Sequence, residues 1–195
     1  MRWREWSGLT VRILLVVGLI AVIPWLSALH QDQIACQGTD SAIFLLQAQS
    51  VPSATQVPCF DRLPVGWRYG ESDVRSGLVR VWLDSDRAGD KAVELILSRT
   101  CDVSGAQPID LANGPRGVQR FDRPDTADAR ETVSFFRFAG GCVTYRFAFT
   151  RRSAPSIFRQ ADRFLGFTPR RVYVEGLRHD DGLTLCGAEA PPCPG

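Results

Sequence analysis

The longest apolar stretch of the chain runs from Ile13 to Leu29 (ILLVVGLIAVIPWLSAL). A helix needs roughly 17–25 such residues to cross the hydrocarbon of a bilayer. Trp6 and Trp25 lie near its two ends, and tryptophan favours the interfaces of a membrane. The pattern therefore predicts an N-terminal transmembrane helix over residues 13–29.

The positive charges around this run are distributed asymmetrically. Arg2, Arg4 and Arg12 precede it, and no further lysine or arginine occurs before Arg62. Because positively charged flanks stay on the cytoplasmic side, residues 1–12 are expected in the cytoplasm. The chain is then a single-pass protein of the cell membrane, with its C-terminal domain outside the cytoplasm.

Two other fates of the N-terminal segment stay open. A cleaved signal peptide has a shorter apolar region, and the best cleavage site here, Leu26-Ser27-Ala28, has a bulky residue where a small one is preferred. Gln33-Ile34-Ala35-Cys36 matches a lipoprotein box only in part. All three fates export the same domain.

Alternating apolar and polar residues predict strands in that domain. The runs Leu78–Leu83 and Ala92–Arg99 alternate, and Asp84–Asp90 between them has the composition of a hairpin loop. In Glu131–Thr150, Gly140-Gly141 predicts a two-residue turn that opposes Phe138 to Val143. Six residues then share one face, which should form the core side of a sheet: Phe136, Phe138, Val143, Tyr145, Phe147 and Phe149.

A helix is predicted to follow. Ser153 is a suitable N-cap, Pro155 fits a first helical turn, and Gly166 followed by Pro169 marks the end. The apolar residues recur at helical spacing: Ile157, Phe158, Ala161, Phe164 and Leu165. A last strand is expected over Arg171–Glu175.

The predicted fold class is α+β. An N-terminal transmembrane helix precedes an antiparallel β-sheet domain, which carries one amphipathic helix packed on it and is stapled by disulfides. We expect a juxtamembrane stalk over residues 30–58, the α+β domain over residues 59–182 and a C-terminal tail over residues 183–195.

All six cysteines follow the apolar run, and an even number of cysteines on the exported side indicates disulfides. Sequence alone does not select among the possible pairings. Our hypothesis pairs neighbours along the chain, as Cys36–Cys59, Cys101–Cys142 and Cys186–Cys193.

Charge and motifs exclude several classes of function. The net charge of +2 arises within residues 1–12, where three arginines accompany Glu5, so the rest of the chain is neutral. A nucleic-acid binder would carry a basic excess. The sequence has no G-x-G-x-x-G, P-loop or G-x-S-x-G motif, and we predict no cofactor. Asp84–Gly89 is similar to the start of a calcium loop, but Ala88 replaces an oxygen ligand, so we predict no metal.

Two sets of polar residues remain as candidates. On a helical wheel Arg152, Arg159 and Arg163 fall together, opposite the apolar stripe, and form the preferred binding face. Its expected partner is anionic lipid, an envelope polymer or another membrane protein. The function predicted is a binding or accessory domain of the cell envelope. The alternative is an envelope hydrolase or transferase that uses His179 as a base, oriented by Asp181.

Overall fold

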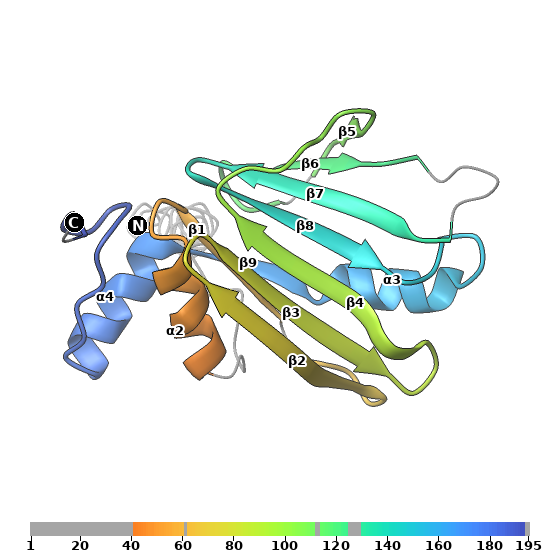
Figure 1. Cartoon of the computed structure of the whole chain (residues 1–195), viewed down its shortest axis with the longest axis horizontal. Helices are drawn as coiled ribbons and strands as arrows, with labels where there is room; N and C mark the ends of the chain where they lie inside the picture. Colours follow the sequence, from red (N-terminus) through yellow and green to blue (C-terminus); the bar gives the residue numbers. More distant parts are fainter. Residues whose placement is uncertain (1–40, 61, 112–113, 125–129, 194–195) are drawn as a thin grey trace, which may run out of the picture. The chain divides into compact units, whose positions relative to one another are not determined.

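A computed structural model describes residues 41–60, 62–111, 114–124 and 130–193 (Figure 1). The predicted span over residues 13–29 and Cys36 lie outside these ranges. Within them, no helix combines the length and the apolar character needed to cross a membrane.

The centre of the fold is a seven-stranded antiparallel sheet with the order β2-β3-β4-β8-β7-β6-β5. Its strands are β2 (Trp67–Arg75), β3 (Leu78–Ser85), β4 (Gly89–Ser98), β5 (Gln107–Ile109), β6 (Gln119–Asp122), β7 (Thr132–Phe138) and β8 (Gly141–Phe147). The predicted hairpin of the two alternating runs is present as β3 and β4. The predicted aromatic face is also present, because all six of its residues are buried in one core cluster.

The β7–β8 hairpin differs from its predicted register. Phe138 pairs with Gly141 rather than Val143, and the turn consists of Ala139 and Gly140. The segment before β1 holds this turn, since the Thr55 amide donates to the Ala139 carbonyl (3.0 Å) and the Ser53 hydroxyl donates to the Gly140 carbonyl (2.7 Å). The shift equals two positions, so every side chain keeps its predicted face.

Helix α3 (Pro155–Arg163) packs on the aromatic face, as predicted (Figure 1). The buried Tyr145 hydroxyl donates to the Ala161 carbonyl at 2.9 Å, and the rings of Phe147 and Phe158 lie 4.7 Å apart. The predicted N-cap is wrong. Ala154 occupies that position without a side-chain bond, and the Ser153 hydroxyl instead accepts from the Thr150 amide.

A second, two-stranded sheet covers more of the same face. It pairs β1 (Gln56–Phe60) with β9 (Leu165–Pro169) in antiparallel register. We expected residues 165–169 to form only the end of the helix. They continue as a strand because they pair with β1 and bury Phe167 against Phe136 (ring centroids 5.4 Å apart) and Phe138 (5.9 Å).

The predicted last strand, Arg171–Glu175, is wrong, because these residues lie in helix α4 (Arg170–Asp180). The helix presents Tyr173, Val174 and Leu177 to an apolar cluster that includes Phe44 of α2 (Ser41–Ser50). The rings of Phe44 and Tyr173 lie 4.3 Å apart. Burial of α2 and β1 places residues 41–58, which we assigned to a stalk, within the packed domain.

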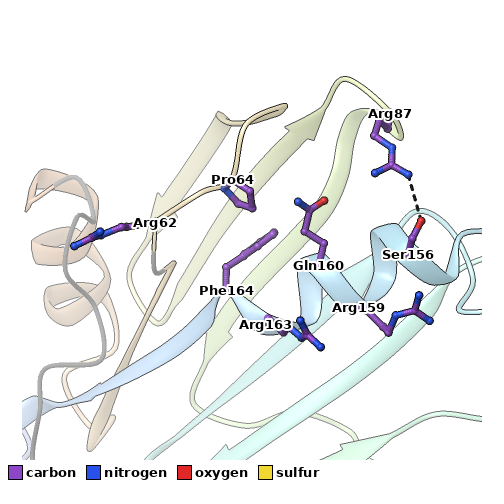
Figure 2. A pocket seen from close by; sticks show the side chains of 8 residues that line it. All are labelled: Arg62, Pro64, Arg87, Ser156, Arg159, Gln160, Arg163 and Phe164. Atoms are coloured by element: carbon purple, nitrogen blue, oxygen red, sulfur yellow. Dashed lines mark hydrogen bonds between the residues drawn. The ribbon is translucent and has the colours of Figure 1, made fainter.

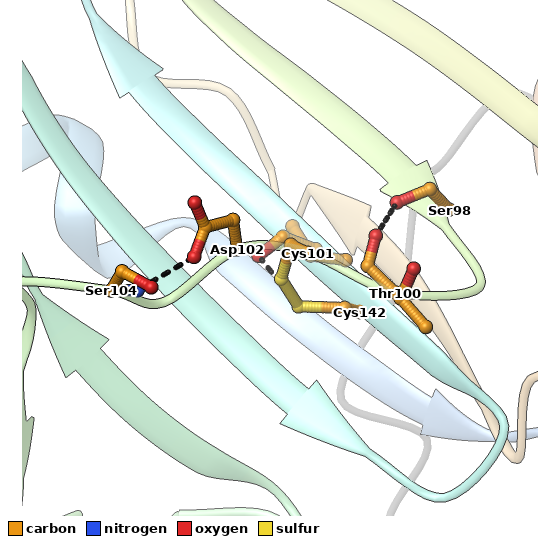
Figure 3. Close-up of a disulfide and its surroundings, with 7 residues drawn as sticks. Ser98, Thr100, Cys101, Asp102, Ser104 and Cys142 are labelled. Carbon is orange, nitrogen blue, oxygen red and sulfur yellow. Dashed lines mark hydrogen bonds between the residues drawn. A yellow bond between two sulfur atoms is a disulfide. The ribbon is translucent and has the colours of Figure 1, made fainter.

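Two of the predicted disulfides are present. Cys101–Cys142 joins the segment after β4 to β8, with Cα atoms 5.8 Å apart, beside the bond of the Ser104 amide to Asp102 (Figure 3). Cys186–Cys193 closes the tail, with a Cα separation of 4.7 Å. Cys59 is also disulfide-bonded, and its predicted partner lies outside the described residues. The described domain is thus dominated by β-sheet, with three helices and two disulfides.

Candidate functional site

A pocket of about 510 Å³ opens where three separate segments of the chain meet (Figure 2). These segments are the loop after β1, the β3–β4 hairpin loop and helix α3. The side chains that line the pocket are Arg62, Pro64, Arg87, Ser156, Arg159, Gln160, Arg163 and Phe164.

Contacts with the core fix the inner wall of this pocket. Phe164 is 4% exposed, and its ring lies 5.1 Å from that of Trp67 and 5.9 Å from that of Phe60. The Trp67 indole N–H donates to Gln160 Oε1 at 3.0 Å. Arg87 donates to the Ser156 hydroxyl at 3.2 Å, which links the hairpin loop to α3 (Figure 2). Packing against the core and the bond between α3 and the hairpin loop therefore hold this side of the pocket in place.

The charge of the lining is entirely positive. Four of the eight residues are arginines and none is acidic. Among the residues that the structure describes, Arg87, Arg159 and Arg163 make no ion pair with a carboxylate. Each guanidinium has five N–H donors in a planar fork, a geometry that matches phosphate and carboxylate oxygens. The arrangement suits an anionic ligand.

Asp162, the acidic residue of helix α3, pairs with a residue of the sheet. Asp162 lies 2.8 Å from the Arg120 guanidinium of β6, which also contacts Asp122 at 2.8 Å. Arg151 pairs with Asp122 as well, and its guanidinium lies over the Phe158 ring. This network, defined by Arg120, Asp122, Arg151 and Asp162, ties α3 to the sheet.

The network keeps Arg120 and Asp122 charged. Burial lowers the pKa of Arg120, but its hydrogen bonds to Asp122 and Asp162 more than offset that effect and leave the pKa raised. Burial raises the pKa of Asp122, yet the hydrogen bonds to Arg120 and Ser134 and the charges of Arg120 and Arg151 together outweigh it, and the pKa is lowered. At neutral pH the pair is an ion pair with most of its hydrogen-bonding capacity satisfied.

The structure divides the predicted binding face. Arg159 and Arg163 line the pocket, whereas Arg152 lies exposed in the turn before α3 and is not part of the lining. Sequence reasoning missed Arg62 and Arg87, because both lie in loops far from α3 in sequence. The one available signal was that Arg87 lies in the predicted hairpin loop over Asp84–Asp90.

Arg170, the first residue of α4, is fully buried. Its guanidinium donates to the carbonyls of Ala48, in the last turn of α2, at 2.6 Å and of Cys186 at 2.7 Å. Carbonyls at a helix C-terminus lack intrahelical partners, and a cation is favourable there. Burial lowers the pKa of this group. Arg170 therefore joins α2 to the C-terminal tail.

The candidate catalytic residues of the alternative function, His179 and Asp181, lie at the end of α4. His179 Nδ1 is 2.8 Å from Asp180 Oδ1, and the two side chains are 86% and 74% exposed. Asp181 caps the helix through its backbone N–H, which donates to the Leu177 carbonyl. His179 lines neither the pocket above nor a second one, of about 460 Å³, beside β5 and β6.

The acidic side chains of the hairpin between β3 and β4 surround the guanidinium of Arg68 in β2. Arg68 contacts Asp84 (3.3 Å), Asp86 (3.4 Å) and Asp90 (3.1 Å). Across the described ranges, no three His, Cys, Asp or Glu side chains are grouped as metal ligands would be.

Comparison with known proteins gives no further guide to the site. No protein-family model matches the sequence, and no significant match was found among curated proteins or solved structures.

Proposed function

We propose that this protein is a binding module of the cell envelope, and that its arginine pocket takes up an anionic group such as phosphate. The observation that carries the proposal is the lining of the pocket, which has four arginines and no carboxylate. Guanidinium groups around a concave surface attract anions and can hold them by bidentate hydrogen bonds.

The remaining lining residues suit a ligand with more than one kind of surface. Ser156 and Gln160 supply a hydroxyl and an amide, whereas Pro64 and Phe164 supply apolar surface. A phosphate attached to an organic group would use both. The candidate sources are an anionic lipid, an envelope polymer or a phosphorylated group on another membrane protein.

The proposed location outside the cytoplasm has two supports. The apolar run over residues 13–29, with arginines on one side only, favours a single-pass anchor with the C-terminal domain exported. Disulfides persist in oxidising compartments, and the Cys101–Cys142 and Cys186–Cys193 bridges fit such a compartment.

Isothermal titration of the full-length chain in a neutral detergent with inorganic pyrophosphate tests the proposal. The variant R159Q/R163Q should bind at least about tenfold more weakly, because charge-assisted hydrogen bonds are lost. The matched control R171Q/R178Q removes two exposed arginines of α4 and should bind like the wild type. No binding by the wild type, or equal weakening in both double variants, would overturn the proposal.

A further inference from the structure

We infer that the ligand of the arginine pocket is the phosphate-bearing headgroup of an anionic phospholipid, and that Val65 enters the membrane interface beside it. The inference rests on the proposed function. It adds one feature of the structure, an apolar residue held at full exposure directly after Pro64, which lines the pocket.

Val65 stands at the tip of a tight turn whose first residue lines the pocket. The Trp67 amide donates to the Pro64 carbonyl at 3.1 Å, and Gly66 has a φ of +88°, as a type II turn requires at its third residue. The Val65 side chain is 102% exposed, the highest value among the large apolar residues of the described chain.

This turn has a fixed position. The Asp86 amide, in the β3–β4 loop, donates to the Gly66 carbonyl at 2.9 Å, and Trp67 is buried in the core. The exposure of Val65 is thus set by the folded backbone. An apolar tip that adjoins a pocket lined by basic side chains is the composition of a surface that lies on anionic lipid.

The nearby carboxylate of Asp86 is compensated in part within the protein, because its partner Arg68 also contacts Asp84 and Asp90. The Asp86 carboxylate, which lies beside Gly66, is paired with Arg68 at 3.4 Å. The proposed anchor would also keep the domain near a bilayer, because only residues 30–40 separate the predicted span from α2 in the sequence. A lipid headgroup is therefore within reach of the domain that the anchor would tether.

Hydrogen–deuterium exchange of the full-length chain in nanodiscs tests the inference. One set of nanodiscs contains phosphatidylcholine alone, and the other also contains phosphatidylglycerol. Phosphatidylglycerol should slow amide exchange in residues 62–66 and 156–164 of the wild type. R159Q/R163Q should lose this protection, with an apparent lipid affinity about 30-fold weaker, whereas R171Q/R178Q should keep it.

A second pair of variants isolates the apolar contact. Val65→Ser should weaken the lipid-dependent protection about three- to tenfold, and Leu183→Ser, which alters another exposed apolar residue, should leave it unchanged. Protection by Val65→Ser equal to that of the wild type would contradict the role of Val65.

The remaining outcomes separate this inference from the proposed function. Equal exchange in the two lipids, with inorganic pyrophosphate still slowing exchange in residues 156–164, would overturn the lipid assignment and leave the anion site standing. Failure of both phosphatidylglycerol and pyrophosphate to slow exchange would overturn both.

Discussion

The Arg120 guanidinium on β6 lies 2.8 Å from the carboxylate of Asp162 on α3. Asp162 is the only acid of that helix, and this contact directs it to the sheet. Arg159 and Arg163 therefore have no acidic partner on their own helix, where residues three or four apart would otherwise pair. The buried network and the basic pocket are thus two consequences of one arrangement of α3.

Asp162→Asn should destabilise the domain by about 1–3 kcal/mol, since a largely buried guanidinium loses a charged partner while keeping Asp122. The free energy of unfolding in urea measures the effect. Asp180→Asn, at a carboxylate that is 74% exposed, is the control and should change stability by less than about 0.5 kcal/mol. Equal effects of the two substitutions would show that the network does not hold α3.

Alkaline conditions should destabilise the wild type more than Tyr145→Phe. Burial raises the pKa of the Tyr145 phenol well above its ordinary value of 10.0. Below that value both states keep the proton, so stability is constant. Above it the unfolded chain releases the proton while the native state retains it, and the free energy of unfolding falls by about 1.4 kcal/mol per pH unit.

Urea unfolding at a series of pH values up to about 11 measures this difference. Burial raises the pKa of Tyr173 to about 12 in both proteins, so Tyr173 contributes equally to the pH dependence of each. At neutral pH the variant should be about 1 kcal/mol less stable, because it loses the bond to the Ala161 carbonyl. The difference in unfolding free energy between the wild type and Tyr145→Phe should narrow as the pH rises. A constant gap would contradict the assigned burial of the phenol.

Gly140→Ala should destabilise the domain by more than about 3 kcal/mol. The residue has a φ of +69°, and an added Cβ would lie 1.8 Å from the Ser53 carbonyl oxygen. Gly105→Ala is a matched control, because Gly105 has a similar φ of +72° with open space around it. It should cost only about 1–2 kcal/mol in unfolding free energy, the conformational strain alone. Similar losses would mean that the turn does not pack on the Ser53 segment.

Arg170→Met should cost about 3–5 kcal/mol of unfolding free energy, because the buried carbonyls of Ala48 and Cys186 lose their donor. Arg171→Met changes the exposed neighbour and should have little effect. Thermal unfolding of the two variants provides the comparison. A tolerated Arg170→Met would indicate that α2 and the tail are held by apolar packing alone.

Local patterns in the sequence were sufficient for the central sheet and for α3. Alternation identified β3, β4, β7 and β8, and helical spacing identified the buried Ile157, Phe158 and Ala161. These features are encoded within single segments, because each buries one face against the same core.

The errors arise where distant contacts decide the structure. Arg171–Glu175 has β-branched residues and alternates, but Tyr173 and Leu177 at helical spacing pack on Phe44 and favour a helix. The register of the β7–β8 turn depends on Ser53 and Thr55, which the local sequence cannot reveal. The pocket also depends on contacts between distant segments, because its four arginines come from three segments and only those of α3 were predicted.

The central claim, that the arginine pocket binds an anion, is tested most directly by NMR of the full-length chain with ¹⁵N-labelled arginine during titration with pyrophosphate. Saturable shifts are expected for the Nε–Hε signals of Arg87, Arg159 and Arg163, while those of Arg171 and Arg178 should stay in place. Shifts that are equal across all arginines and do not saturate would indicate non-specific association and contradict the claim.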